Sequence, residues 1–231
     1  MHAIFKMKKQ LLAIVFICTI STSSSQINEI GLLIGGTNYI GDIGRTNYIL
    51  PNKIGGGVIY KYNLNPRIAL RGTFSYLPIE ADDANATNSV RKKRNYNFKN
   101  NIKELAVGIE YNFFEYDISS PDKISTPYIL LEIVGFNYSH IISETVPNQY
   151  NFKNKTSYTI PFGLGFKSKL IHNIAFAVET KVSYTFEDDL DFTTSKIPSL
   201  NFVGESNDWY VFTGISIVYT FGRPACYSEF R

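Results

Sequence analysis

The feature that most constrains the fold of this chain is a two-residue alternation of side-chain character that recurs in separate segments. In 67–76 and 104–113, large apolar residues occupy every second position, with small or charged residues between them. Successive side chains of a β-strand point to opposite faces, whereas a helix repeats every 3.6 residues. The alternation therefore predicts strands with one bulky apolar face and one small or charged face.

The same pattern predicts eight strands in one domain. The regular ones are 67–76, 104–113, 158–167, 174–184 and 209–221, and less regular ones lie at about 28–38, 54–63 and 127–139. Segment 127–139 is apolar at both parities, so the pattern leaves open which of its faces points inward.

The composition of the two faces favours a membrane barrel over a soluble sandwich. A soluble fold would bury the large residues, but here the other face carries Gly, Ala, Ser, Thr and charges, which suit a narrow lumen. Aromatic residues make up 15% of the chain, as expected of lipid-facing aromatic belts. We therefore expect an all-β fold, an eight-stranded antiparallel transmembrane β-barrel.

The N-terminal segment reads as a secretion signal. A lysine-containing start, an apolar run at 11–20 and a serine-rich stretch at 21–25 predict cleavage after Ser25. Ile17 before Cys18 is not small, which disfavours a lipid anchor. We expect a signal peptide at 1–25, the barrel at 26–222 and a short periplasmic tail at 223–231.

Link lengths predict the orientation in the outer membrane of a Gram-negative bacterium. The links 63–66 and 170–173 are tight, 115–126 is intermediate, and those at about 39–53, 77–97, 140–156 and 187–207 are long. Outer-membrane barrels have short periplasmic turns and long outer loops. Both termini are therefore expected in the periplasm.

Charge and cysteine usage exclude some partners. Removing Lys6, Lys8 and Lys9 from the 23 basic residues leaves 20, which equals the 20 acidic residues. A neutral mature chain argues against nucleic acid. Cys226 is the one cysteine after cleavage, so neither a disulfide nor a cysteine metal site is expected. We expect no cofactor, and we expect outer-membrane lipid and the barrel-assembly machinery as partners.

Charges of both signs fall on the predicted inner face. They are Lys61, Arg67, Arg71, Glu104, Glu110, Lys167, Glu179 and Lys181. Because a buried charge needs a partner, we interpret them as lumen ion pairs, with Arg71 and Glu110 at similar depth. A proton or ion path is the weaker alternative, since so small a barrel is too narrow for an aqueous pore.

The last strand carries a second candidate, an assembly signal. Gly214, Ile217, Tyr219 and Phe221 place a glycine, an aliphatic residue and alternating aromatics at the end of the barrel. A final strand is an unpaired edge until the barrel closes, so it suits recognition by strand addition.

Three further segments carry weaker signals. The acidic residues at 187–191 could bind calcium, but they lack the spacing of a calcium loop, so a solvated loop is favoured. The basic run 91–94 fits either a lipopolysaccharide contact or a charged rim. Ser139 and His140 are neighbours in a strand and point to opposite faces, so they predict no nucleophile–base pair and no enzyme.

Several stretches resemble the PorG family, the outer-membrane barrel component of the Bacteroidetes type IX secretion system. They are 29–42 with G-G-T-N-Y-I-G-D, 63–67, 104–114 and 160–167 with I-P-F-G-L-G-F-K. The acidic segment 187–191 departs from the family pattern. The resemblance implies a barrel that contacts a periplasmic ring of a lipoprotein and its partner, in a machine also linked to gliding motility.

Two other functions stay open. A small OmpX- or OmpA-like barrel would act in adhesion or resistance through its outer loops, and a lipid-modifying enzyme would need a His-centred site at the membrane rim. The secretion component is expected to use its periplasmic turns and tail instead.

Overall fold

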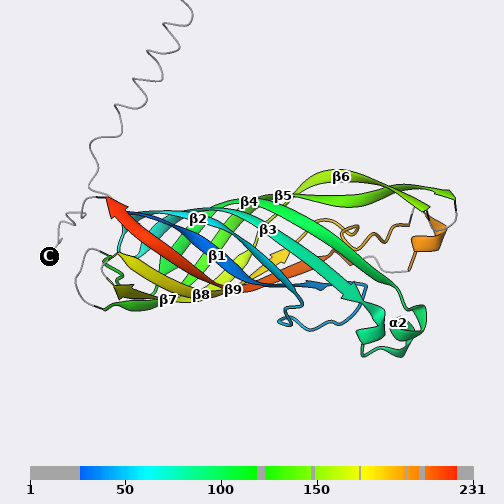
Figure 1. Cartoon of the computed structure of the whole chain (residues 1–231), viewed down its shortest axis with the longest axis horizontal. Coiled ribbons are helices and arrows are strands. Elements are labelled where there is room, and N and C mark those ends of the chain that lie inside the picture. The colour runs from blue at the N-terminus through cyan, green and yellow to red at the C-terminus, as the bar shows by residue number, and fades with distance from the viewer. Residues whose placement is uncertain are drawn as a thin grey trace, which may run out of the picture.

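The computed structural model describes residues 27–118, 123–146, 149–171, 173–195, 197–202 and 206–222 as one antiparallel sheet with three short helices (Figure 1). The strands are β1 (Ile27–Ile40), β2 (Lys53–Asn65), β3 (Ile68–Asp82), β4 (Asn97–Asn112), β5 (Ser125–Val146), β6 (Gln149–Thr159), β7 (Phe162–Ile171), β8 (Ile174–Tyr184) and β9 (Trp209–Gly222). The helices are η2 (Asp83–Asn85), α2 (Ser89–Arg94) and η3 (Pro198–Leu200). None of the helices in these ranges is long and apolar enough to cross a membrane.

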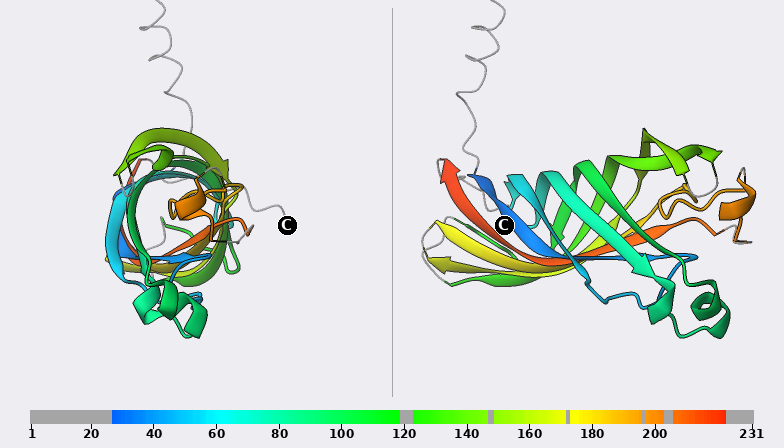
Figure 2. Two further views of the ribbon diagram at one scale, coloured as in Figure 1. Left: turned by 90° about the vertical axis from the view of Figure 1, so that its right-hand side faces the viewer. Right: turned by 45° about the vertical axis from the view of Figure 1, so that its right-hand side comes forward.

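Eight of these strands close into a ring. β1 pairs with β9 over its full length, from Ile27↔Gly222 to Ile40↔Trp209, and β4 pairs with the first half of β5. The order around the ring is β1-β2-β3-β4-β5-β7-β8-β9, and β6 pairs with the second half of β5. The end-on view in Figure 2 shows the closed ring. The predicted eight-stranded antiparallel fold is confirmed.

The sixth predicted strand is interrupted. The expected strand 158–167 is split after Thr159, and β7 begins at Phe162. Pro161 lacks an N–H and cannot donate to the ladder, although its carbonyl accepts the N–H of Glu132 at 3.2 Å. β7 therefore takes this place in the ring, and β6 continues beyond it along the same edge of β5.

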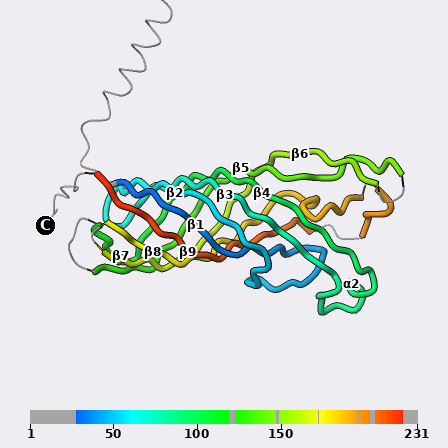
Figure 3. Tube along the Cα trace, viewed as in Figure 1, coloured from blue at the N-terminus to red at the C-terminus, as the bar shows by residue number. Residues whose placement is uncertain are grey.

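Two of the predicted long links are wrong in extent. β3 continues into 77–97 as far as Asp82 and is followed there by η2 and α2, and β5 and β6 replace 140–156 by a hairpin. A bilayer needs only about 9–11 residues per strand, whereas β5 has 22. The extra length projects at one end, beyond the closed ring (Figures 1 and 3). We call this the loop end, and the end with the tight β2–β3 and β7–β8 turns the turn end.

The outward face of the ring is a belt of large apolar side chains. Its members, 41% to 70% exposed, include Ile30, Leu32, Ile34, Val58, Leu70, Leu105, Val107, Ile109, Leu131, Ile133, Leu164, Val178, Ile215 and Ile217. An exposed apolar surface of this extent on every strand of a closed ring is suited to lipid rather than water.

Aromatic side chains gather at both edges of this belt. At the loop end, the ring of Tyr184 lies 5.4 Å from that of Phe186 and 4.8 Å from that of Trp209. At the turn end, Tyr111 packs against Phe113 at 6.0 Å. Such girdles mark the two interfaces of a transmembrane barrel, and they give the belt its upper and lower limits.

The interior differs from the prediction at the loop end. Below it, the inward residues are small or charged as expected, but Phe136, Tyr138, Tyr210 and Phe212 form a buried apolar core nearer the mouth. Val211, predicted to face outward, is also buried. The inward aromatic residues are found there because the strands outrun the bilayer, so their upper interior packs like the core of a soluble protein.

A side chain seals the point where β4 and β5 separate. Above Asn137 the two strands are no longer paired, and Ser139 would lose its backbone partner. The Asn100 amide donates to the carbonyl of Ser139 at 2.7 Å and accepts its N–H at 3.2 Å. An amide side chain thus replaces one rung of the ladder.

The two ends of the barrel can be assigned to the two sides of the membrane by labelling. Ser195 is exposed at the loop end and Asn173 at the turn end. In a Cys226→Ser background, Ser195→Cys should react with a membrane-impermeant maleimide on whole cells, and Asn173→Cys only after lysis, because short turns face the periplasm. The opposite pattern would reverse the orientation.

Candidate functional site

Among the described residues, ten charged side chains carried by the strands are buried inside the ring, and their signs balance. Each is at most 6% exposed. The cations are Lys61, Arg71, Lys167, Lys169 and Lys181, and the anions are Glu29, Glu104, Glu110, Glu132 and Glu179. Because an uncompensated charge in such a place is strongly unfavourable, the balance is a condition for folding.

Arg71 and Glu179 form the centre of this cluster. The guanidinium binds the carboxylate through two parallel contacts of 2.7 and 2.8 Å, the bidentate geometry that suits arginine. Tyr128 donates to the same carboxylate at 2.7 Å, and Arg71 Nε donates to Thr73 at 3.2 Å. The pair spans the lumen from β3 to β8, so it ties opposite walls together.

Glu110 lies nearer the turn end and binds two lysines. Lys61 Nζ is 2.8 Å from one of its oxygens and Lys167 Nζ is 2.5 Å from the other. Lys167 also lies 4.5 Å from the centre of the Tyr116 ring, within the range of a cation–π contact. Both oxygens of this carboxylate are therefore compensated.

Lys181 carries the network towards the loop end. Its ammonium is 3.0 Å from Glu104 and 3.3 Å from Glu132. Tyr210 donates to the second oxygen of Glu104. The charged cluster meets the apolar core at this level, since Tyr210 belongs to both.

One residue of the predicted set lies elsewhere. The Arg67 side chain is 44% exposed and pairs at 3.2 Å with the rim residue Glu115, whose side chain is 71% exposed. It precedes β3, in the β2–β3 turn, where alternation no longer determines the face. Arg67 is therefore not a lumen ion pair. The other seven residues of the set are buried and paired as described above.

The predicted pairing of Arg71 with Glu110 is secondary. Their closest atoms are 3.7 Å apart, longer than the contacts of Arg71 with Glu179. Sequence reasoning also missed Glu29, Glu132 and Lys169. Glu132 lies in the segment that is apolar at both parities, and as its one charge it could have indicated the inward face, because a charge is costly against lipid.

Both ends of the lumen are closed by chain segments. At the turn end, Tyr116 and Ile118 from the β4–β5 link are buried against Ala175 and Val218, and Lys169 donates to the carbonyl of Ile118 at 2.8 Å. At the loop end, Leu190 enters the apolar core. The lumen is filled by its own side chains.

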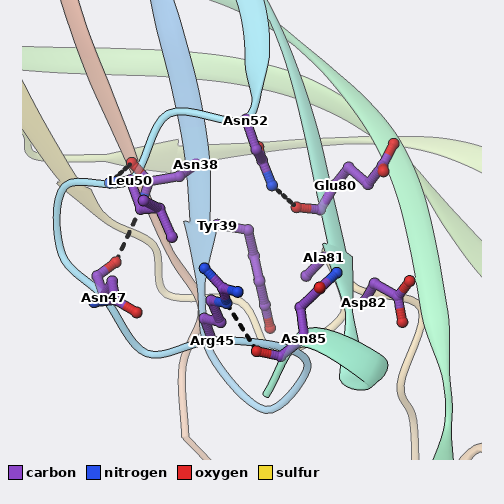
Figure 4. Close-up of a pocket in the computed structure, with 10 residues that line it drawn as sticks. All are labelled: Asn38, Tyr39, Arg45, Asn47, Leu50, Asn52, Glu80, Ala81, Asp82 and Asn85. Carbon is purple, nitrogen blue, oxygen red and sulfur yellow. Dashed lines mark hydrogen bonds between the residues drawn. The ribbon is translucent and has the colours of Figure 1, made fainter. Parts of the chain in front are cut away.

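The outside of the ring has a polar hollow at the loop end and an apolar hollow on the belt. The polar one, of about 310 Å³, lies between the β1–β2 loop and the end of β3, and Figure 4 shows Arg45, Asn47, Glu80 and Asn85 around it. The apolar one, of about 790 Å³, lies on the belt over β1, β2 and β9. Gly56 is among the residues that line this hollow, and it has no side chain to fill it.

The weaker candidates are placed as follows. His140 approaches Asp189 at 3.5 Å, but the Ser139 hydroxyl bonds Asn154 instead of the imidazole. His172 lies outside the described residues. No group of three or more His, Cys, Asp or Glu that could hold a metal occurs among the residues described.

The acidic and basic loop segments have structural contacts. Glu187 and Asp189 bind Lys155 at 2.6 and 3.0 Å. Arg91 donates to the carbonyl of Gly44 at 3.0 Å and so fastens α2 to the β1–β2 loop. Arg94 binds Asp83 at 2.6 Å.

The residues of the predicted assembly signal lie on β9. Ile217, Tyr219 and Phe221 point outward and are about half exposed, while Gly214 has the opposite parity. A Cβ at Gly214 would come within 2.5 Å of the carbonyl of Ile34 and of the Phe212 ring, so this position needs glycine for close approach. The tail 223–231 with Cys226 lies outside the described residues.

The closed ring, the apolar belt and the filled lumen define the class of protein: an eight-stranded β-barrel of the outer-membrane type. The chain belongs to the family described as Domain of unknown function (DUF6089), which matches residues 8–229. No curated protein matches the sequence.

Solved outer-membrane barrels are similar at low identity. The N-terminal β-barrel domain of Pseudomonas aeruginosa OprF has 13% identity over 86% of this chain and 98% of that chain, with a TM-score of 0.46. Yersinia pestis Ail, in complex with the heparin analogue sucrose octasulfate, has 13% identity over 85% and 99%, at 0.49. Neisserial surface protein A has 10% identity over 86% and 98%, at 0.47.

The central ion pair should dominate the stability of the ring. Arg71→Ala leaves Glu179 without its bidentate partner, and unpairing a buried charge costs about 3–5 kcal/mol. Arg67→Ala is the matched control, because an exposed pair contributes only about 0–1 kcal/mol. Urea unfolding in detergent measures both. Equal losses for the two variants would contradict the burial of the central pair.

Proposed function

We propose that the protein is a non-enzymatic outer-membrane barrel that anchors part of a protein secretion machine of the type IX kind, with its turn end in the periplasm. The observation that carries the proposal is the filled lumen. Ten buried charges and a plug at each end occupy the space a solute would need. This favours a role carried by the two end surfaces of the barrel.

The turn end offers a shaped surface for a periplasmic partner. A hollow of about 330 Å³ is lined by Asn65, Pro66, Arg67, Ile68, Tyr111 and Glu115. The link that carries Glu115 is held in place by buried Tyr116, whose N–H donates to the carbonyl of Pro66 at 3.0 Å. A preformed surface costs less ordering entropy on binding. The resemblance to the PorG family supports a ring-forming lipoprotein and its partner as occupants.

The projecting loop end favours a second candidate. Hairpins β3–β4 and β5–β6 extend well past the belt, and α2 lies at the tip of the β3–β4 hairpin (Figure 1). Surface loops carried on a rigid barrel are a common place for recognition. A surface barrel acting in adhesion or resistance would use this end.

Substitutions at the two ends distinguish the candidates. Glu115→Arg places a second cation beside Arg67 and changes the charge of the turn-end hollow. The matched loop-end variant is Lys92→Ala with Lys93→Ala on exposed α2. If the turn end docks a periplasmic ring, the first variant should insert normally, co-purify with less ring protein and secrete less cargo, while the second behaves as wild type.

The opposite result would favour the surface barrel. Insertion is checked separately by heat-modifiable migration on a gel, which reports a closed barrel. If the Glu115→Arg protein inserts, binds ring protein and secretes cargo normally, the proposed docking at the turn end is contradicted.

A further inference from the structure

Two fully buried carboxyls hold the plug at the loop end. The plug consists of the described residues 187–195 and 197–202 after β8, and Leu190 within it is buried in the apolar core. Asn100 donates to the carbonyl of Leu190 at 2.8 Å. Asp191 lies in the plug and Asp208 just before β9, and both have no exposed surface. In the end-on view of Figure 2 the segment lies within the outline of the ring.

Both carboxyls bind the same phenol. Tyr39 Oη lies 2.8 Å from Asp191 Oδ2 and also bonds Asp208 Oδ1. The backbone N–H of Asp42 donates to Tyr39 Oη at 3.2 Å. A phenol has one hydrogen, so Tyr39 can donate to only one of the two carboxyls. The other contact is a hydrogen bond only if that carboxyl carries a hydrogen of its own.

The surrounding donors indicate which carboxyl carries it. Asp191 Oδ1 accepts two hydrogen bonds from Thr193, at 2.9 Å from the N–H and 2.7 Å from the hydroxyl. Asp208 Oδ2 accepts one, from the N–H of Leu190 at 3.0 Å. Asp191 is therefore the better stabilised anion, and the hydrogen belongs on Asp208 Oδ1.

The neighbouring charges do not neutralise the pair. Burial and then the charge of Asp191 raise the pKa of Asp208 well above its ordinary value, and Asp188 adds to this. Burial also raises the pKa of Asp191, with Asp42 contributing, against the hydrogen bonds from Thr193. Basic side chains at this end contact other acids: Lys155 binds Glu187 and Asp189, the imidazole of His140 approaches Asp189, and Arg94 binds Asp83. Among the described residues, no salt bridge reaches Asp191 or Asp208.

We propose that the plug is a proton-coupled closure, which docks with one proton shared along Asp208, Tyr39 and Asp191 and releases that proton when it opens. In the open state both carboxyls are hydrated and ionise with an ordinary pKa of about 3.9. The docked state binds the extra proton, so docking weakens as the pH rises above that value, until the raised pKa of the docked pair is reached. Opening exposes the apolar core of the mouth, while the charged lumen below stays filled.

Hydrogen exchange at the amide of Leu190 measures the opening. Its N–H donates to Asp208, which lies outside the plug, so it exchanges only when the plug undocks. After correction for the intrinsic exchange rate, the opening equilibrium should rise about tenfold per pH unit from roughly pH 5 upward. The amide of Val211 in the barrel wall serves as the internal reference and should show no such slope.

Amide substitutions remove the proton without removing the contacts. In Asp208→Asn the side-chain NH₂ donates to Tyr39 and the oxygen still accepts from Leu190, so the plug should stay docked with its pH slope abolished. Asp191→Asn reverses the direction of the hydrogen bonds along Asp191, Tyr39 and Asp208. It should likewise keep the plug docked without a pH slope, and it provides a second variant if Asp208→Asn fails to fold. Asp42→Asn is the matched control, because its side chain does not contact the phenol, and it should keep the slope.

Two results would overturn the proposal. One is a wild-type opening equilibrium that does not change with pH. The other is a slope in Asp208→Asn and Asp191→Asn equal to that of the wild type, which would place the titrating group elsewhere.

Discussion

Compensation of the buried charges inside the ring is the constraint on which the rest of the structure depends. The ten charges come from β1, β2, β3, β4, β5, β7 and β8. A slip of one residue in any of these strands would turn its charges toward lipid and leave their partners unpaired. Strand register, ring closure and the direction of every side chain are thus coupled through one network.

Because this network fills the lumen, the surfaces at the two ends of the barrel are more accessible to a partner than the interior. The charged residues fill the ring within the belt, and the apolar core fills it above. Tyr116 and Ile118 close one mouth and Leu190 closes the other. What remains available for recognition is the rim at the turn end and the projecting hairpins at the loop end, and the plug between the hairpins is held by a shared proton rather than by a salt bridge.

Much of this could be predicted from alternation. The outward belt at positions such as Leu105, Val107 and Ile109 follows from a rule that needs only neighbouring residues. The rule failed where its assumptions ended: Arg67 lies in a turn, Pro161 interrupts a strand, and Tyr210 and Phe212 lie above the bilayer, where large residues belong inside. Each error arose where a strand begins, ends or is interrupted, and the alternation of residues does not specify those positions.

The sequence by itself determined that the chain forms strands, that each has a lipid-facing and a lumen-facing side, and that the lumen side carries charges of both signs. Only the tertiary structure decided which charge meets which. Arg71 binds Glu179, 108 residues away, more closely than Glu110 on the adjacent strand. Asp191 and Asp208 likewise meet only through Tyr39, which comes from the other end of the chain. The physical reason is that alternation is local, whereas contacts across the lumen depend on the diameter and stagger of the closed ring.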